Sequence, residues 1–278
     1  MRRQGKTKKG FTLVEMLVVM AIIVIMSAIA IPTLVRSGAL SRDEMGASAR
    51  TLLNMLRAGR VYSATFRTDT AVVYFLKQVP DSRDNTSQVV VDAIALARCA
   101  TPAELQTFSL GPEKKVFFLV GGNEGGIVSL ERGSCIQARV ENLLDNSTQD
   151  QLLGQVPRTN NLMRQGVYPV QLFTLTPGSG GTPPSVTEVS PRAGLESLSW
   201  GWTTYPLNRY FPAHVFRPNG ELRTERDETP GRLELRINYT PDTRVEDRFI
   251  APNKEVAGVR IELNRFTGKA RILEEEAG

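Results

Sequence analysis

A single carboxylate, Glu15, lies inside an otherwise apolar run that extends to Val35. A charged side chain inside a membrane costs about 2.5–3.5 kcal/mol on insertion scales, so such a carboxylate usually has a cationic partner. No Lys or Arg between Phe11 and Val35 supplies one. Hydrolysis of the Gly10–Phe11 bond would create an α-amino group four residues before Glu15, which could pair with it on the same helix or on a neighbouring copy. The second arrangement would order copies of the chain in a filament.

The apolar run has the length of a membrane-spanning helix. The 21 residues from Phe11 to the residue before Pro32 extend over about 31 Å as a helix, close to the ~30 Å hydrocarbon core of a bilayer. A basic leader without acidic residues, Met1–Gly10, precedes this run. Such a charge bias keeps the leader on the cytoplasmic side. Residues 11–35 are therefore expected to cross a membrane once and to place the rest of the chain on the far side.

The stretch KKGFTLVEMLVVMAIIVIMSAIAIP resembles the class III signal of type IV pilins and type II secretion pseudopilins. The similarity consists of the basic leader, the Gly before a Phe, the Glu at the fifth position of the mature chain, and Pro32 at the twenty-second. The resemblance implies cleavage after Gly10 by a prepilin peptidase/methyltransferase, N-methylation of Phe11, and assembly through Glu15. It also implies a bacterial inner-membrane precursor, an inner-membrane assembly platform, and pilin or pseudopilin subunits as partners. The alternatives are an uncleaved signal-anchor and a secretory signal cut near Ser27–Ala30.

Residues 36–67 are expected to continue the helix beyond Pro32 as an amphipathic segment. Pro32 removes a backbone hydrogen bond, so it is expected to bend or loosen the helix. This kink is either a tolerated irregularity or a feature that lets the helix repack as it leaves the membrane. The apolar residues recur at spacings of three and four, which predicts one buried stripe: Met45, Ala49, Leu52, Leu53, Leu56, Tyr62 and Phe66.

Residues 68–278 are expected to form a β-rich antiparallel head on which the long helix packs, which gives an α+β fold class. Short runs of Val, Ile, Phe and Tyr alternate with turn residues there. The last two runs are joined by Asn264–Gly268, a hairpin with Gly where a positive φ is needed. Strands are expected at residues 71–79, 89–96, 116–120, 167–175, 198–203, 213–216, 232–239, 258–263 and 269–273.

The C-terminal part of the head resembles the GspH/FimT group of minor pseudopilins. The similarity lies in His214–Gly220, in the segments RLEL and GVRI that follow, and in Thr267–Lys269, and residues 56–76 fit the same group. Residues from about 80 to 197 exceed the group's pattern, so they are expected to be a variable insertion. Within this insertion the Pro/Gly-rich residues 176–185 predict a surface loop. The size of the chain favours a low-copy minor or tip subunit.

Two cysteines, Cys99 and Cys135, follow the predicted membrane span. In an oxidising compartment a pair of cysteines is more often bridged than reduced, so a disulfide between them is expected. Closing that loop would stabilise the fold by roughly 4 kcal/mol on the chain-entropy model. The alternative is two reduced thiols in the core.

The residue inventory argues against catalysis. His214 is the only histidine, and no GxSxG motif accompanies a serine, so a hydrolase would have to use His214. One histidine and two distant cysteines give no zinc-ligand spacing, and no cofactor motif is present. Trp200 and Trp202 suit either a sheet core or a stacking surface for sugar or single-stranded DNA. The acidic end, Glu274–Glu276, is expected to be a solvated tail, and the alternative there is a calcium site.

The net charge of +5 also carries topological information. All of the excess lies in the leader, because the chain from Phe11 onward has equal numbers of basic and acidic residues. A nucleic-acid partner is therefore not indicated. The sequence favours a non-enzymatic structural subunit of a type IV pilus, a secretion pseudopilus or a DNA-uptake filament. The alternatives are a membrane-anchored β-domain that binds sugar or peptide without assembling, and an anchored hydrolase.

Overall fold

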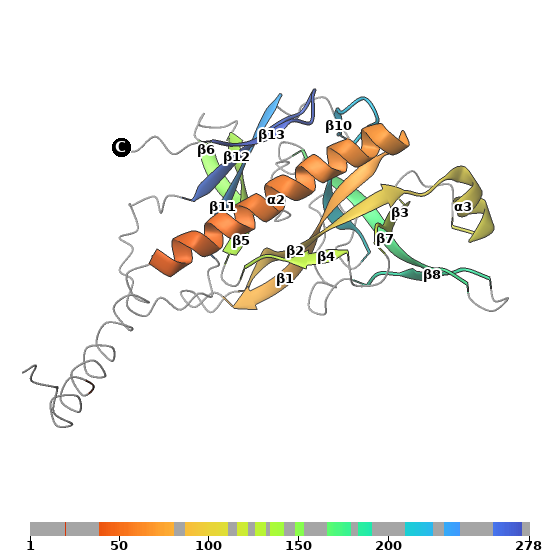
Figure 1. Cartoon of the computed structure of the whole chain (residues 1–278), viewed down its shortest axis with the longest axis horizontal. Helices are drawn as coiled ribbons and strands as arrows, with labels where there is room; N and C mark the ends of the chain where they lie inside the picture. The colour runs from red at the N-terminus through yellow and green to blue at the C-terminus, as the bar shows by residue number, and fades with distance from the viewer. Residues whose placement is uncertain are drawn as a thin grey trace, which may run out of the picture. The chain divides into compact units, whose positions relative to one another are not determined.

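The computed structural model describes residue 20 and residues 39–80, 87–110, 116–121, 126–131, 134–141, 148–152, 166–178, 183–190, 209–224, 231–239 and 258–273. The chain divides into two compact units, Met1–Asp43 and Glu44–Gly278. In the first unit the described residues are Met20, which is helical and exposed, and the first turn of the helix α2. The second unit contains most of α2 and the β-rich head (Figure 1).

The helix α2 spans Ala39–Phe66 and leads directly into the strand β1, Thr70–Pro80, which confirms the expected order of helix and strand. Its buried stripe was predicted correctly up to Leu56, but the extension was wrong at Phe66, and Tyr62 is only half-buried. Phe66 is 62% exposed, whereas Ser63 is fully buried. At about 100° per residue, Ser63 returns to the face of Leu56, while Tyr62 lies about 120° away from it. The stripe therefore continues through small residues instead of aromatic ones.

Five strands of the first sheet close into a ring. The order β9-β1-β2-β3-β7 is completed by a pairing between β7 and β9. All neighbours in the ring are antiparallel except β3 and β7, which are parallel. The expectation of a purely antiparallel head was wrong at this point, since the long connection from β3 to β7 passes through three other strands and allows a parallel return. Beyond β1, the ring strands are β2 (Ser87–Cys99), β3 (Val116–Leu119), β7 (Tyr168–Thr176) and β9 (Phe211–Phe216).

Three short strands extend the ring. The strand β4 (Ile127–Ser129) pairs with β2, β8 (Ser185–Glu188) pairs with β7, and β10 (Leu222–Arg223) pairs with β9. The described parts of the loop between β7 and β8 are exposed, as expected for its Pro/Gly-rich sequence. Closure of the ring pairs both edges of its five strands, which removes most of the open sheet edge.

The interior of the ring is packed with alternate residues of its strands. On β1, Ala71, Val73 and Phe75 join the cluster that the five strands share, while the residues between them face α2. A run of alternating alanines on β2, from Ala93 to Ala97, leaves room for larger side chains from the other strands. A small ring of strands needs this mixture of small and large residues to fill its interior without voids.

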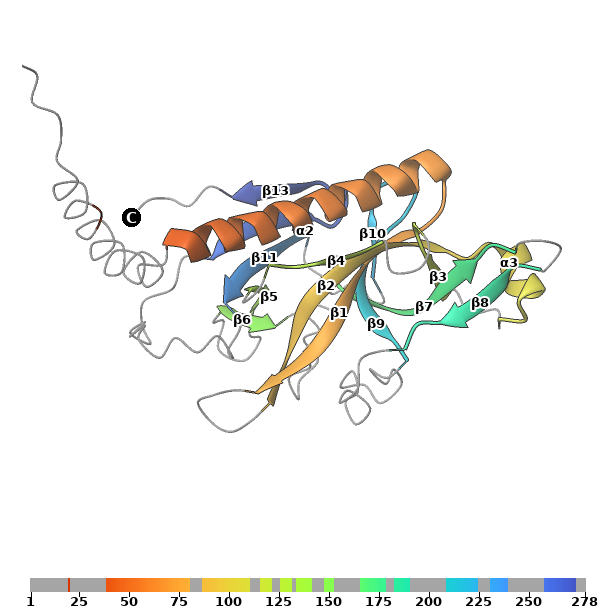
Figure 2. The same ribbon diagram turned by 60° about the horizontal axis from the view of Figure 1, so that its bottom comes forward.

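The second sheet is antiparallel throughout, in the order β13-β12-β11-β5-β6. Apolar and charged residues alternate on β11 and β12, as the sequence predicted, and the apolar ones share a core with α2 and with one face of β1. Figures 1 and 2 show α2 running past strands of both sheets. The strands are β5 (Ser134–Glu141), β6 (Thr148–Leu152), β11 (Arg232–Tyr239), β12 (Val259–Asn264) and β13 (Ala270–Leu273).

A short helix, α3 (Pro102–Thr107), follows β2 and was not predicted. It begins with a capping box in which the side chain of Thr101 accepts a hydrogen bond from the backbone of Glu104 and the Glu104 side chain accepts one from the backbone of Thr101. This arrangement satisfies two backbone donors at the start of the helix. The predicted strand at residues 198–203 lies outside the described residues.

Candidate functional site

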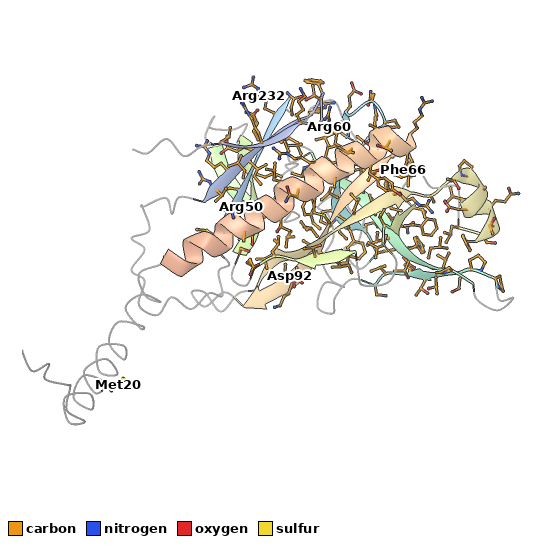
Figure 3. All side chains as sticks on the ribbon, viewed as in Figure 1. Met20, Arg50, Arg60, Phe66, Asp92 and Arg232 are labelled. Atoms are coloured by element: carbon orange, nitrogen blue, oxygen red, sulfur yellow. The ribbon has the colours of Figure 1, made fainter. Side chains whose placement is uncertain are left out.

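The sequence-predicted processing site lies outside the described residues. This holds for Gly10, Phe11, Glu15 and Pro32, and within the predicted membrane span only Met20 is described (Figure 3). None of the helices in the described part of the chain is both long enough and apolar enough to cross a membrane. Trp200, Trp202 and the acidic C-terminal residues are also outside the described ranges.

The structure does describe the contacts between α2 and the head. One of them is a buried polar contact at Ser48. The hydroxyls of Ser48 and Ser134 lie 2.7 Å apart, and Ser48 Oγ accepts a hydrogen bond of 3.0 Å from the backbone of Glu131. Ser48 and Ser134 are 1% and 4% exposed. Buried hydroxyls that lose such partners cost free energy, so this contact fixes the position of α2 along the head.

The C-terminal half of α2 is held by a close backbone approach and by hydrogen bonds. A Cβ atom on Gly59 would lie 3.0 Å from a methyl carbon of Val72 and 3.1 Å from the ring of Phe216. Arg60 Nε donates a 2.7 Å hydrogen bond to the carbonyl oxygen of Thr267. A side chain at position 59 would therefore have to displace Val72 or Phe216 where the helix crosses β1 and β9. The arginine attaches the same turn of α2 to the β12–β13 hairpin.

The β12–β13 hairpin has the turn that the sequence predicted. Gly268 has φ +61°, a value that residues with a side chain rarely adopt. The side-chain oxygen of Asn264 accepts hydrogen bonds from the backbone of Phe266 and Thr267, at 3.1 and 2.9 Å. This turn brings Thr267 to Arg60 and positions one wall of a surface groove.

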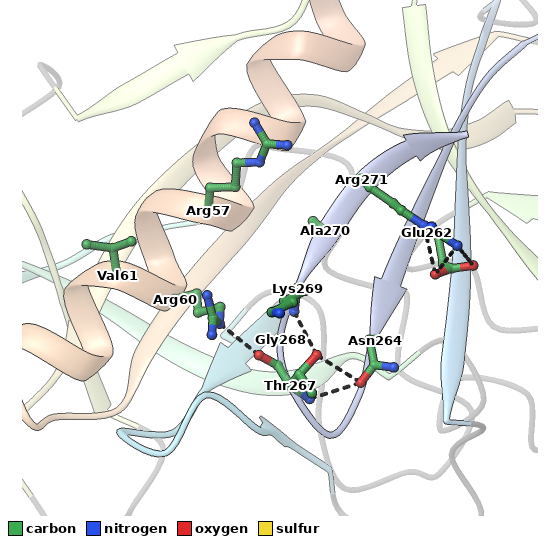
Figure 4. A pocket seen from close by; sticks show the side chains of 10 residues that line it. All are labelled: Arg57, Arg60, Val61, Glu262, Asn264, Thr267, Gly268, Lys269, Ala270 and Arg271. Atoms are coloured by element: carbon green, nitrogen blue, oxygen red, sulfur yellow. Dashed lines mark hydrogen bonds and ion pairs between the residues drawn. The ribbon is translucent and has the colours of Figure 1, made fainter. Parts of the chain in front are cut away.

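The groove lies between α2 and the β12–β13 hairpin and has a volume of about 570 Å³ (Figure 4). Four cationic side chains line it: Arg57, Arg60, Lys269 and Arg271. One carboxylate, Glu262, also lines it and pairs with Arg271 at 3.1 Å. Sequence reasoning missed this groove because its two walls are far apart in the chain.

The single histidine is buried away from solvent. His214 is 0% exposed, and its Nδ1 lies 2.6 Å from the hydroxyl of Tyr74, which is also fully buried. Burial raises the pKa of Tyr74 above its ordinary value. A catalytic histidine has to reach a substrate, whereas His214 sits inside the core on β9. The sequence-based preference for a structural histidine on a strand agrees with this position.

The expected disulfide between Cys99 and Cys135 is contradicted by the structure, in which the two sulfurs are not joined. Cys135 packs against Val90 near the start of β2, and Cys99 is the last residue of that strand. Nine residues of strand extend over about 30 Å, while a disulfide needs Cα atoms within about 7 Å. Burial raises the pKa of the Cys99 thiol to about 11, so it is a weak nucleophile at neutral pH.

The end of β2 carries an ion pair that sequence reasoning also missed. Both guanidinium NH groups of Arg98 contact the carboxylate of Glu104, at 2.8 and 2.5 Å. The hydrogen bonds from Arg98 hold the pKa of Glu104 at about 2, well below its usual value. This pair attaches α3 to β2. In the described ranges no three His, Cys, Asp or Glu side chains are placed to hold a metal ion.

Comparison with known proteins gives one match. Residues 5–31 match the prokaryotic N-terminal methylation motif, and this range includes Gly10, Phe11 and Glu15. The chain therefore carries a type IV pilin-like processing signal. Such a signal implies a membrane-anchored precursor that a prepilin peptidase processes, and it is typical of structural subunits and not of enzymes. No curated protein and no solved structure matches the chain.

Proposed function

We propose that the chain is a minor pilin or pseudopilin, a structural subunit of a pilus-like fibre, possessing no catalytic activity of its own. The match of residues 5–31 to the methylation motif carries this proposal. The attachment of α2 to the head along its buried stripe supports it, because a fibre subunit must pass force from its helix to its head. In this proposal residues 1–10 are the leader, 11–35 the membrane helix, 36–67 its amphipathic continuation and 68–278 the head.

The proposed mechanism is a sequence of physical states. The helix of residues 11–35 is first held in the inner membrane with the leader in the cytoplasm. Removal of the leader after Gly10 gives Phe11 a cationic amine, which N-methylation keeps cationic. In the fibre this amine pairs with Glu15 of a neighbouring subunit, where a low dielectric strengthens the pairing. The apolar faces of the helices are buried against one another, and the head points outward.

A substitution at Glu15 tests the proposal. Glu15→Ala removes the carboxylate but leaves the Gly10–Phe11 bond, so cleavage should proceed normally while incorporation into fibres falls sharply. Glu15→Asp keeps the charge and is the matched control, with assembly between that of the wild type and that of Glu15→Ala. Immunoblots of sheared fibres and of membrane fractions measure both steps. Wild-type levels of Glu15→Ala in fibres would refute the pairing role.

A further inference from the structure

The groove between α2 and the β12–β13 hairpin has an excess of positive charge. Arg57 and Lys269 are exposed, and among the described residues neither forms an ion pair with a carboxylate. Arg60 uses its Nε for the carbonyl oxygen of Thr267, which leaves its terminal NH groups for a ligand. Figure 4 shows Arg57 and Arg60 on the turns of α2 that face the hairpin. The groove therefore suits a ligand with several negative charges.

The lining favours an acidic peptide over a nucleic acid. None of the residues that line the groove is aromatic, so bases would have no ring on which to stack. Beside the cations it is lined by small residues of the hairpin, such as Gly268 and Ala270, and by Val61 of α2. Carboxylates on an extended segment can pair with arginine side chains one after another.

The chain itself contains such a segment. Three consecutive glutamates, Glu274–Glu276, directly follow the last residue of β13. The same segment of a second copy is not tethered beside this groove, so it can lie along the cations of both walls, Arg57 and Arg60 on one side and Lys269 and Arg271 on the other.

We propose that this groove binds the acidic C-terminal segment, Glu274–Gly278, of a second copy of the chain. The contact is heterologous, since a groove on one copy receives the end of another, and contacts of this kind propagate into open filaments unless they close into a ring. The place of this contact in a fibre rests on the proposed function. The binding of the segment to the groove does not depend on cleavage of the leader. It adds a second contact between copies to the pairing of Glu15 with Phe11.

A peptide-binding experiment tests the proposal. The full-length chain in a non-ionic detergent is titrated against a fluorescently labelled LEEEAG peptide, and anisotropy is measured at about 0.05 M and about 0.5 M salt. We expect binding that weakens with salt, since exposed ion pairs are screened. The R57Q/K269Q variant should bind about tenfold more weakly, as expected for the loss of two exposed ion pairs. Arg50→Gln, two turns earlier on the same face of α2, is the matched control and should bind as the wild type does.

Three outcomes would overturn the proposal. The first is equal binding of an LQQQAG peptide, and the second is unchanged binding by R57Q/K269Q. The third is a chain without Glu274–Gly278 that is monomeric and binds the peptide several-fold more tightly than the wild type, which would show that each groove holds its own tail. Because the titration needs no processed N-terminus, its failure would leave the proposed function standing, and failure of processing would leave the titration unaffected.

Discussion

At the scale of single residues, Arg98 and Glu104 form a charge pair in the described head. Two hydrogen bonds join them, and Thr101 adds two more to the same carboxylate. These contacts favour the ionised form of Glu104, which is why its pKa lies at about 2. Because the pKa in the folded state is lower than in the unfolded state, the pair stabilises the fold above pH ~4.3, and this contribution is lost as the pH falls towards 2.

The titration of Glu104 gives a prediction at this scale. NMR of the Glu104 carboxyl group should show a midpoint near pH 2 in the wild type. Arg98→Gln removes the strongest cause of the shift and should move the midpoint towards about 4.3, the value of an unperturbed glutamate. Arg209→Gln changes an exposed arginine elsewhere in the head and should leave it unchanged. A wild-type midpoint at an ordinary glutamate value would show that the pair does not form in solution.

The cysteines show what residue types alone cannot predict. The expected Cys99–Cys135 bridge rested on the compartment and on the count of thiols. Cys99 is the last residue of β2, whereas Cys135 on β5 packs near the start of β2. The distance between them is therefore fixed only by the packing of β5 against β2, which residue types do not reveal. For His214 the sequence was sufficient to predict a structural role, because its apolar neighbours on β9 already indicated a core strand.

At the scale of elements, the close approach of α2 to the first sheet depends on Gly59. Gly59→Leu would push a large side chain into Val72 and Phe216. Overpacking of this kind typically costs 1–3 kcal/mol, so we expect the free energy of unfolding to fall by about 2 kcal/mol. Ala58→Leu, at the exposed neighbouring position, is the control and should change it by less than about 0.5 kcal/mol. Chemical denaturation followed by circular dichroism measures both; equal effects of the two variants would contradict this packing.

Elements with strong apolar periodicity were predictable from the sequence. The strands β1, β2, β7, β11 and β12 all have alternating or continuous Val, Ile, Leu and Phe, and their observed bounds are close to the expected ones. The strands β5, β6 and β8 were missed because residues such as those of Thr148–Leu152 are polar, and these strands depend on pairing with neighbours. The helix α3 had a recognisable signal, the T-x-x-E capping box at Thr101.

At the scale of the whole molecule, the order of strands could not be read from the sequence. Closure of the first sheet needs β7 to pair with both β3 and β9, and one of these pairings is parallel. Apolar periodicity predicts which face of a strand is buried, but it does not predict its partners. The groove was unpredictable for the same reason, since its cations come from α2 and from the β12–β13 hairpin, which lie far apart in the chain. The processing signal was predictable because all of its residues lie within one short stretch.

The contacts between α2 and the head also bear on the proposed fibre. The buried stripe of α2, the Ser48–Ser134 contact and the Arg60–Thr267 hydrogen bond attach the helix to both sheets. A pull on residues 44–66 would therefore reach the head through these contacts, most of which are buried. This attachment is what a subunit needs if its N-terminal helix is packed in a fibre core while its head is exposed.

The N-terminus of the native protein is the most direct test of this account. Mass spectrometry of the chain purified from its host should find a mature polypeptide that begins with N-methylated Phe11 and lacks Met1–Gly10. A native chain that still begins with Met1, or that begins beyond Ala30, would contradict the proposed processing and, with it, assembly into a fibre.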